Sequence, residues 1–319
     1  MKRFTLFSIM IPLVCMACYA QPAIPIDSLI STLWYRTSCL EPDSIRISTL
    51  SQMQPFADSC SNISFTAYNK NEKPELWQDL EENGILKFHK EACDKILNEI
   101  QNTVVKEGNV VLWHLYNMGY IVKTPSQCFG IDIKHKAASL FAEHIDFLLI
   151  THRHGDHYTT ALIDAMERLQ KPVVSNFIEN GFKINEPQKL AFGEIRILAT
   201  PVDHNKQLPD FVITYQIDCG AHAGNCVIFH AGDAYDANQI NPDQAVNLFI
   251  PHVSVGLDIQ KVIDKSAPQW ILMSHILELG HPVNKWRWSY PFGIEKCRKL
   301  KHGNVYLPVW GEKIVWTGL

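Results

Sequence analysis

Short apolar runs separated by turn residues dominate the chain from Asn109 onward. Runs of this length, bounded by Gly, Pro, Asn or Ser, are typical of strands, because those residues end strands and form turns. The pattern predicts strands over residues 110–113, 120–123, 129–133, 145–150, 172–175, 194–200, 211–218, 227–229, 246–250 and 271–274, and a helix over 160–170. So many strands with few helices predict stacked sheets that are covered by helices.

The region before residue 105 has a different period. Phe88, Ala92, Ile96, Leu97 and Ile100 recur at helical spacing. We therefore expect an N-terminal, partly helical extension over residues 21–105 and a main domain over residues 106–319. The extension carries no motif, so we favour packing against the main domain as its role. A cap over a functional site is the alternative.

The first twenty residues differ from the rest of the chain. Lys2 and Arg3 precede an apolar stretch over residues 4–16, and small residues end at Ala20. This order predicts a secretory signal peptide that is cleaved after Ala20, and hence an exported, periplasmic or secreted protein. The apolar stretch is short for a membrane span. A lipid anchor on Cys18 is disfavoured because Cys15 stands where a lipoprotein signal has Leu or a similar residue. This alternative is not excluded.

Composition describes an ordinary globular chain of 319 residues, of which 46% are hydrophobic and 19% charged. The chain has 29 basic and 33 acidic residues, and loss of Lys2 and Arg3 with the signal would leave 27 and 33, a net charge of -6. Nucleic-acid binding requires a basic surface, so we expect a small-molecule substrate and no nucleic-acid partner.

Seven cysteines follow the signal: Cys39, Cys60, Cys93, Cys128, Cys219, Cys226 and Cys297. An odd number leaves at least one free thiol in an exported chain. Disulfides between Cys219 and Cys226 and between Cys39 and Cys60 are conceivable. None of the seven has the spacing of a thiolate metal site or a redox pair, and buried free thiols are the default interpretation for the others.

The strongest chemical signal is the motif His152-Arg153-His154-Gly155-Asp156-His157, which directly follows the apolar run over 145–150. Two histidines at i and i+2 after a strand direct their imidazoles the same way, so one ion can bind His152 and His154 and a second can bind Asp156 and His157. Imidazole with carboxylate suits zinc, iron or manganese. The alternative is a polar loop that caps the next helix, and four such residues in six positions disfavour it.

This motif resembles the signature of the metallo-β-lactamase-fold hydrolases. The resemblance implies an α/β fold, the four-layer αββα sandwich, over roughly residues 109–319, with the metal ligands on one edge. It also implies further ligands after later strands. These are His204 as the third histidine of the first metal, Asp233 as a bridge between both ions, and His275 to complete the second metal, with His281 as a competitor for that position.

The same resemblance implies a supporting role for Asp132, which would hold a ligand histidine by its other ring nitrogen. His114, His222, His230, His252 and His302 fit no ligand position, although His230 and His252 lie near strand ends. The aromatic segment 286–292 is interpreted as packing around a C-terminal helix. Its alternative role is to line a pocket in which Arg287 or Lys285 holds an anionic group.

The implied function is hydrolysis by two divalent ions, with zinc favoured over manganese or iron. A metal-bridging hydroxide would attack an ester, lactone or phosphodiester, and Asp156 would also steer the proton of that water. Asp233 favours the lactonase and phosphodiesterase-like branch over true β-lactamases. The alternatives are a mono-iron oxidoreductase of the persulfide dioxygenase kind and a non-catalytic protein that contains metal.

Overall fold

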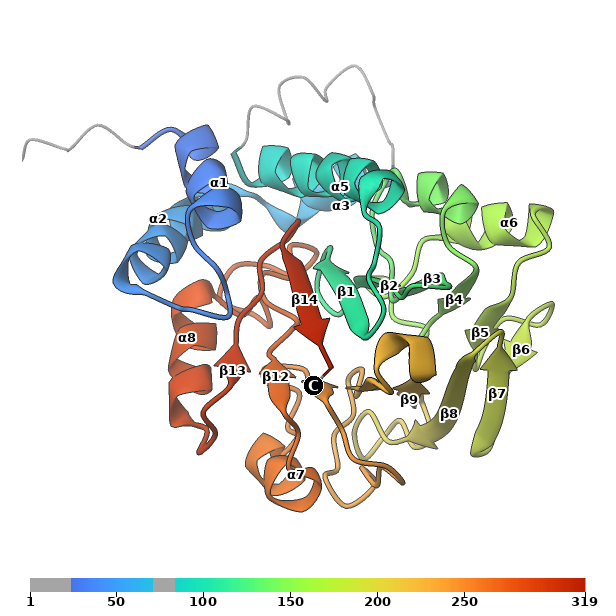
Figure 1. Cartoon of the computed structure of the whole chain (residues 1–319). Helices are drawn as coiled ribbons and strands as arrows, with labels where there is room; N and C mark the ends of the chain where they lie inside the picture. Colours follow the sequence, from blue (N-terminus) through green and yellow to red (C-terminus); the bar gives the residue numbers. More distant parts are fainter. Residues whose placement is uncertain (1–23, 71–83, 319) are drawn as a thin grey trace, which may run out of the picture.

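The computed structural model describes residues 24–70 and 84–318 (Figure 1). The expected signal peptide and its cleavage site lie outside these residues. Within the described ranges, no helix has both the length and the apolar character needed to cross a membrane.

The first of two seven-stranded sheets has the strand order β14-β1-β2-β3-β4-β5-β6. Its strands are β1 (Asn109–His114), β2 (Tyr120–Lys123), β3 (Cys128–Ile131), β4 (Phe147–Leu149), β5 (Val173–Ser175), β6 (Phe182–Lys183) and β14 (Lys313–Thr317). The strands from β14 to β3 pair antiparallel, and those from β3 to β6 pair parallel. The parallel part brings the carboxyl ends of β3, β4 and β5 to one edge of the sheet.

The second sheet has the order β13-β12-β11-β10-β9-β8-β7. Its strands are β7 (Gln188–Phe192), β8 (Ile195–Val202), β9 (Val212–Asp218), β10 (Val227–His230), β11 (Leu248–Ile250), β12 (Trp270–Leu272) and β13 (Val305–Tyr306). The strands from β7 to β10 are antiparallel and those from β10 to β13 are parallel. Strands β8, β10, β11 and β12 therefore all end at the same edge.

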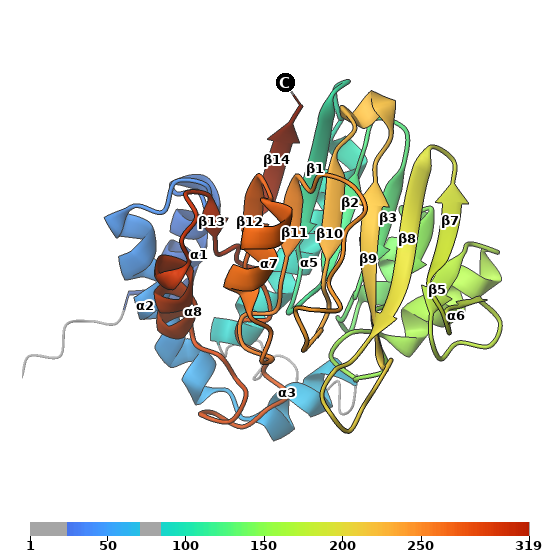
Figure 2. The same cartoon turned by 90° about the horizontal axis from the view of Figure 1, so that it is seen from below.

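The inner faces of the two sheets form one hydrophobic core. Val110 and Leu112 of β1 share this core with Ile197 and Ala199 of β8, and all four side chains are buried. Outer layers are added by helices, as Figures 1 and 2 show for α5 and α6 beside the first sheet and α7 and α8 beside the second. The described helices are α1 (Ile26–Tyr35), α2 (Ser44–Ser59), α3 (Asn62–Asn69), α5 (Gly84–Asn102), α6 (Thr160–Arg168), α7 (Ile259–Ser266) and α8 (Tyr290–Lys299), with short 3-10 turns at Ala138–Glu143 and Ala221–Ala223. The expected four-layer αββα sandwich is confirmed.

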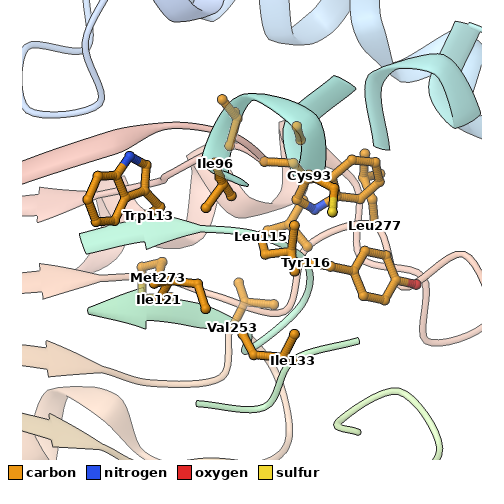
Figure 3. Packing of buried hydrophobic residues seen from close by; sticks show 14 of the residues in the cluster. Cys93, Ile96, Trp113, Leu115, Tyr116, Ile121, Ile133, Val253, Met273 and Leu277 are labelled. Carbon is orange, nitrogen blue, oxygen red and sulfur yellow. The ribbon is translucent and has the colours of Figure 1, made fainter. Parts of the chain in front are cut away.

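Helix α5 packs on the first sheet with the face that its sequence period predicted. Cys93 and Ile96 of α5 belong to the same buried cluster as Trp113 of β1 and Ile121 of β2 (Figure 3). Burying these apolar side chains against the sheet removes them from water, which is what holds an amphipathic helix in place.

Polar contacts also join the N-terminal helices to the sandwich. Arg46 of α2 forms a buried ion pair with Glu312 at 2.7 Å. Arg287 donates to the carbonyls of Ala57 at 3.0 Å and Cys60 at 2.7 Å, so it links the α2–α3 region to the main domain and does not present its charge to a pocket. These contacts support packing as one role of the N-terminal region.

All seven cysteines are free thiols in the described part of the chain, and six of them are buried. The two conceivable disulfides, Cys219–Cys226 and Cys39–Cys60, are not formed there.

Candidate metal centre

The residues singled out from the sequence lie on loops at one edge of the sandwich. The motif with His152 and His157 directly follows β4, His204 follows β8, Asp233 follows β10 and His275 follows β12. Because these four strands end at the same edge, segments far apart in sequence place their polar side chains together.

A first cluster brings together three histidines and one carboxylate. The ligand atoms of His152, His154, His204 and Asp233 all lie within 4.8 Å of one another. His154 Nδ1 lies 3.0 Å from His152 Nε2 and 3.1 Å from His204 Nε2. Three imidazole nitrogens and a carboxylate oxygen at this separation form a donor set suited to zinc, iron or manganese.

A second cluster lies directly beside the first and contains Asp156, His157 and His275. Asp156 Oδ2 is 3.0 Å from His275 Nε2 and 3.4 Å from His157 Nε2. Asp233 connects the clusters. Its Oδ2 is 3.8 Å from Nε2 of both His152 and His204, whereas its Oδ1 is 3.5 Å from His157 Nε2.

The residues fit a bound cation because two of their buried polar atoms have no hydrogen-bond partner without one. His157 Nε2 and Asp233 Oδ1 are buried, and neither has a hydrogen-bond partner. A buried polar atom without a partner costs free energy, and a metal ion between these two atoms would remove that cost. The site thus fits a divalent metal cofactor.

A buried network under the clusters fixes the orientation of the imidazoles. Asp132 Oδ2 accepts a hydrogen bond from His157 Nδ1 at 2.8 Å and another from the Thr151 hydroxyl at 2.7 Å. The same hydroxyl oxygen lies 3.0 Å from His152 Nδ1. With Nδ1 engaged in this way, His152 and His157 each direct Nε2 toward the cluster. The contact that the sequence predicted for Asp132 is present.

Burial and the neighbouring charges lower the pKa of some side chains in the clusters and raise the pKa of others. Burial lowers the pKa of His152 well below its usual value. Burial also lowers the pKa of His157, but the surrounding carboxylates, with Asp156 the strongest, outweigh it and raise that pKa well above the usual value. For Asp233, burial raises the pKa, yet the neighbouring His157 and other imidazoles bring it well below the usual value. The carboxylates therefore favour positive charge beside His157, which is the charge that a bound cation would supply.

Of the two candidates for the last ligand, His275 lies in the cluster. The side chain of His281 is 40% exposed, and its Nε2 lies 3.7 Å from Glu278. Among the described residues, no group with metal-ligand geometry includes His281. His275 also has a left-handed backbone with φ of 66°, an uncommon conformation for a non-glycine residue and one that marks a functional or strained position.

His252 is a site residue that the sequence interpretation left without a role. It forms a third close group with Asp233 and His275, and its ring stacks on His275 with centroids 4.1 Å apart. Its Nδ1 accepts a hydrogen bond from the Ser254 amide, which leaves Nε2 free. A signal was available, because His252 follows β11, the strand between those that precede Asp233 and His275.

The other unassigned histidines lie elsewhere. His230 is buried with Nε2 bonded to the Met118 carbonyl at 2.9 Å, and His114 contacts the Asn117 carbonyl at 3.0 Å. His222 is exposed beside Glu107. His302 is half-buried in the turn after α8.

A cavity of about 620 Å³ opens onto the clusters. Its lining includes the candidate ligands His154, Asp156, His204, Asp233 and His275, with His252, Trp286 and Trp288 on its walls. The aromatic segment therefore does line a pocket, although the interpretation favoured from sequence was packing alone. A cavity of this size beside a metal centre accommodates a small organic molecule.

Comparison with known proteins supports this assignment. The model of a family described as the β-lactamase superfamily domain matches residues 106–272, about half of the chain. A comparison with curated proteins gave no match.

Many solved structures share the fold, among them a hydrolase and a hydroxylase. A metallo hydrolase from the archaeon Ignicoccus hospitalis, Igni18, is 17% identical with a TM-score of 0.50, covering 65% of this chain and 98% of its own. The diiron β-hydroxylase CmlA from Streptomyces venezuelae is 14% identical with a TM-score of 0.51, covering 67% of this chain and 55% of its own. At these identities the likeness concerns the fold alone. With the family match over residues 106–272 and the clustered histidines and aspartates, the chain belongs to the β-lactamase superfamily, the metal-dependent hydrolases of the metallo-β-lactamase fold.

Proposed function

We propose that the protein is a dinuclear metal-dependent hydrolase that acts on an ester, lactone or phosphodiester of small size. One observation carries this proposal. The two oxygens of Asp233 face different sets of imidazoles, with Oδ2 toward His152 and His204 and Oδ1 toward His157. A carboxylate in this position suits a bridge between two ions. The ions would be held by His152, His154 and His204 on one side and by Asp156, His157 and His275 on the other.

Bound divalent ions, with zinc favoured, lower the pKa of a coordinated water toward neutrality and polarise the oxygen of the scissile group. The chain supplies the rest. Asp156 lines the cavity and is 19% exposed, so its ionised carboxylate is placed to accept a hydrogen bond from a water in the cavity and to orient that water's proton. Asn117 donates to Asp156 Oδ2 at 3.1 Å and fixes its orientation. Trp286 and Trp288 offer apolar walls that exclude water from a bound substrate.

Oxidative chemistry is the main alternative, because a diiron hydroxylase shares the fold. A mono-iron oxidoreductase of the persulfide dioxygenase kind would leave Asp156, His157 and His275 idle, although these residues lie together. A non-catalytic role would leave the cavity over the ligands without a purpose. We propose in addition that the chain is exported and that residues 1–20 direct this.

Elemental analysis of the purified protein tests the proposal first. We expect two divalent ions per chain, a clear loss of metal in Asp233→Ala, and unchanged content in Asp236→Ala, a control on the same loop. One iron per chain that survives Asp233→Ala would favour the oxidoreductase.

Activity is then measured on a panel of esters, lactones and phosphodiesters. The wild-type protein should hydrolyse a member of the panel, and His154→Ala should not. Wild-type and His154→Ala proteins that are equally inactive across the panel would contradict a hydrolytic function and favour the non-catalytic role.

A further inference from the structure

A second cavity, of about 290 Å³, lies beside the metal centre. Its lining comes from both parts of the chain, with Phe65, Thr66 and Asn69 of α3 on one side and Asp156 and Glu278 of the sandwich on the other. Figure 2 shows α3 below the lower ends of the strands. Gly155, Asp156 and His281 line this cavity and the larger one alike, so the two cavities adjoin at a candidate metal ligand.

Lys134 brings a positive charge to this cavity without a partner for it. The residue is half-buried, and in the described part of the chain no carboxylate oxygen lies within 4.0 Å of its ammonium group. Burial lowers the pKa of Lys134, while the more distant Asp156 and Glu278 act in the opposite sense. A charge withdrawn from water without a partner is costly, and a bound anion would offset that cost.

Asn69 supplies a second unused polar group. Both its side-chain atoms, Nδ2 and Oδ1, are buried and have no hydrogen-bond partner. Asn69 is the last residue of α3, and the exposed Lys70 follows it at the rim of the same cavity. A free amide donor and two lysines are therefore arranged around one space.

The carboxylates that line the cavity are already engaged. Glu278 accepts from the amides of Gly280 at 2.9 Å and His281 at 2.6 Å. Asp156 Oδ2 is bound to His275 and Asn117. Neither carboxylate forms an ion pair with the lysines, so the cationic groups stay available to a ligand.

We infer that this cavity binds a second anionic group of the substrate, a carboxylate or a phosphate, through Lys134, Asn69 and Lys70 while the scissile group lies at the metal centre. This inference rests on the proposed function and narrows its substrate to anionic molecules. It also gives the N-terminal region a functional role, because α3 forms one wall of the anion-binding cavity.

Calorimetric titration of the metal-loaded full chain tests the inference. The probes are straight-chain dicarboxylates from malonate to adipate, each paired with the monocarboxylate that lacks its second carboxylate. We expect the best dicarboxylate to bind about tenfold or more tightly than its partner, as a hydrogen bond to a charged group allows. Phosphonocarboxylates of the same lengths distinguish a phosphate from a carboxylate.

The preference should largely vanish in Lys134→Met and fall in Asn69→Leu. The control Lys301→Met removes an exposed lysine after α8 and should keep the preference. Metal content and circular dichroism of each variant check that it is folded, and Lys70→Met serves if Lys134→Met does not fold. A wild-type protein without preference, or a preference that survives every substitution in the cavity, overturns the inference.

The readout is binding and does not require turnover. A preference for dicarboxylates in a protein that hydrolyses nothing would sustain the cavity assignment while removing the proposed hydrolase. Hydrolysis without such a preference would sustain the proposed hydrolase and remove the cavity assignment.

Discussion

Asp132 Oδ2 and His157 Nδ1 lie 2.8 Å apart, and both side chains are fully buried. Asp132 also accepts from the amide and the hydroxyl of Thr151, both at 2.7 Å, and its own backbone has a positive φ of 49°. The carboxylate thus holds an imidazole of the candidate metal centre through Nδ1 and is itself held at two further points.

Loss of this carboxylate should weaken metal binding without removing a ligand. In Asp132→Asn the amide no longer orients His157 through a charged hydrogen bond, so we expect metal affinity to fall by about 10- to 100-fold. Competition with a coloured chelator measures the affinity. Asp146→Asn is the control, since Asp146 accepts from the Cys128 amide away from the centre. Equal affinity in Asp132→Asn and wild type would show that Asp132 does not support the site.

Removal of metal should lower the stability of the protein. A ligand that binds only the folded state stabilises it by about 2.7 kcal/mol at a hundredfold excess over its Kd. We expect a chelator to lower the free energy of unfolding, measured in urea, by about 2.7 kcal/mol or more. The chelator effect should shrink in His275→Ala and persist in His281→Ala. The opposite pattern would make His281 the ligand.

The ion pair between Arg46 and Glu312 should be essential to the attachment of the N-terminal helices. Glu312 is 7% exposed and also accepts from the amides of Cys39 and Val309. Arg46→Met leaves this buried carboxylate without its cation, and we expect a loss of about 3–5 kcal/mol in the free energy of unfolding. The double variant Arg46→Met with Glu312→Gln should recover part of that loss. A loss below about 1 kcal/mol in the single variant would contradict this account.

The stability of the protein should fall in acid because of His89. The imidazole of His89 lies between the rings of Phe65, Tyr116 and Trp310. Both its ring nitrogens are buried and have no hydrogen-bond partner among the described residues. Burial lowers the pKa of His89 well below the usual value. The unfolded chain takes up this proton near pH ~6.5, whereas the folded chain does not until much lower pH. The contribution of His89 is thus complete above that pH and is lost as the pH falls, by about 1.4 kcal/mol per pH unit.

His89→Phe fills the same aromatic space without a titrating group. Urea unfolding at pH 7 and pH 5, with chelator present so that metal release plays no part, should show a shallower loss in this variant. Equal losses in the variant and wild type would mean that His89 is protonated in the folded protein.

Much of the main domain could be predicted from local patterns. The run over 120–123 coincides with β2, and the runs over 110–113 and 194–200 lie within one or two residues of β1 and β8. The short final strand β14 was not predicted. Its residues alternate between exposed and buried positions, which is a local strand signal that the strand prediction did not use. Its pairing with β1, antiparallel and across more than two hundred residues of sequence, could not be read from local patterns.

The metal centre shows the same division. The sequence by itself determined the donor types, since the run from His152 to His157 concentrates imidazole and carboxylate directly after a strand. Resemblance to a family added His204, Asp233 and His275. Only the tertiary structure decided that His275 lies by Asp156 while His281 does not, because strand order sets which loop ends meet.

The roles of Asn69 and Lys134 were visible only in the tertiary structure, because nothing in their neighbours along the chain marks them. His252 had a local signal, since it follows a strand, but its place beside Asp233 and His275 was also decided by the tertiary structure. Their character comes from burial beside groups distant in sequence, which leaves His252 stacked on His275 and Asn69 without a partner. The sequence determines which atoms can donate a hydrogen bond, accept one or bind a cation. The packing of the two sheets and the helical extension determines which of those atoms are withdrawn from water and face one another.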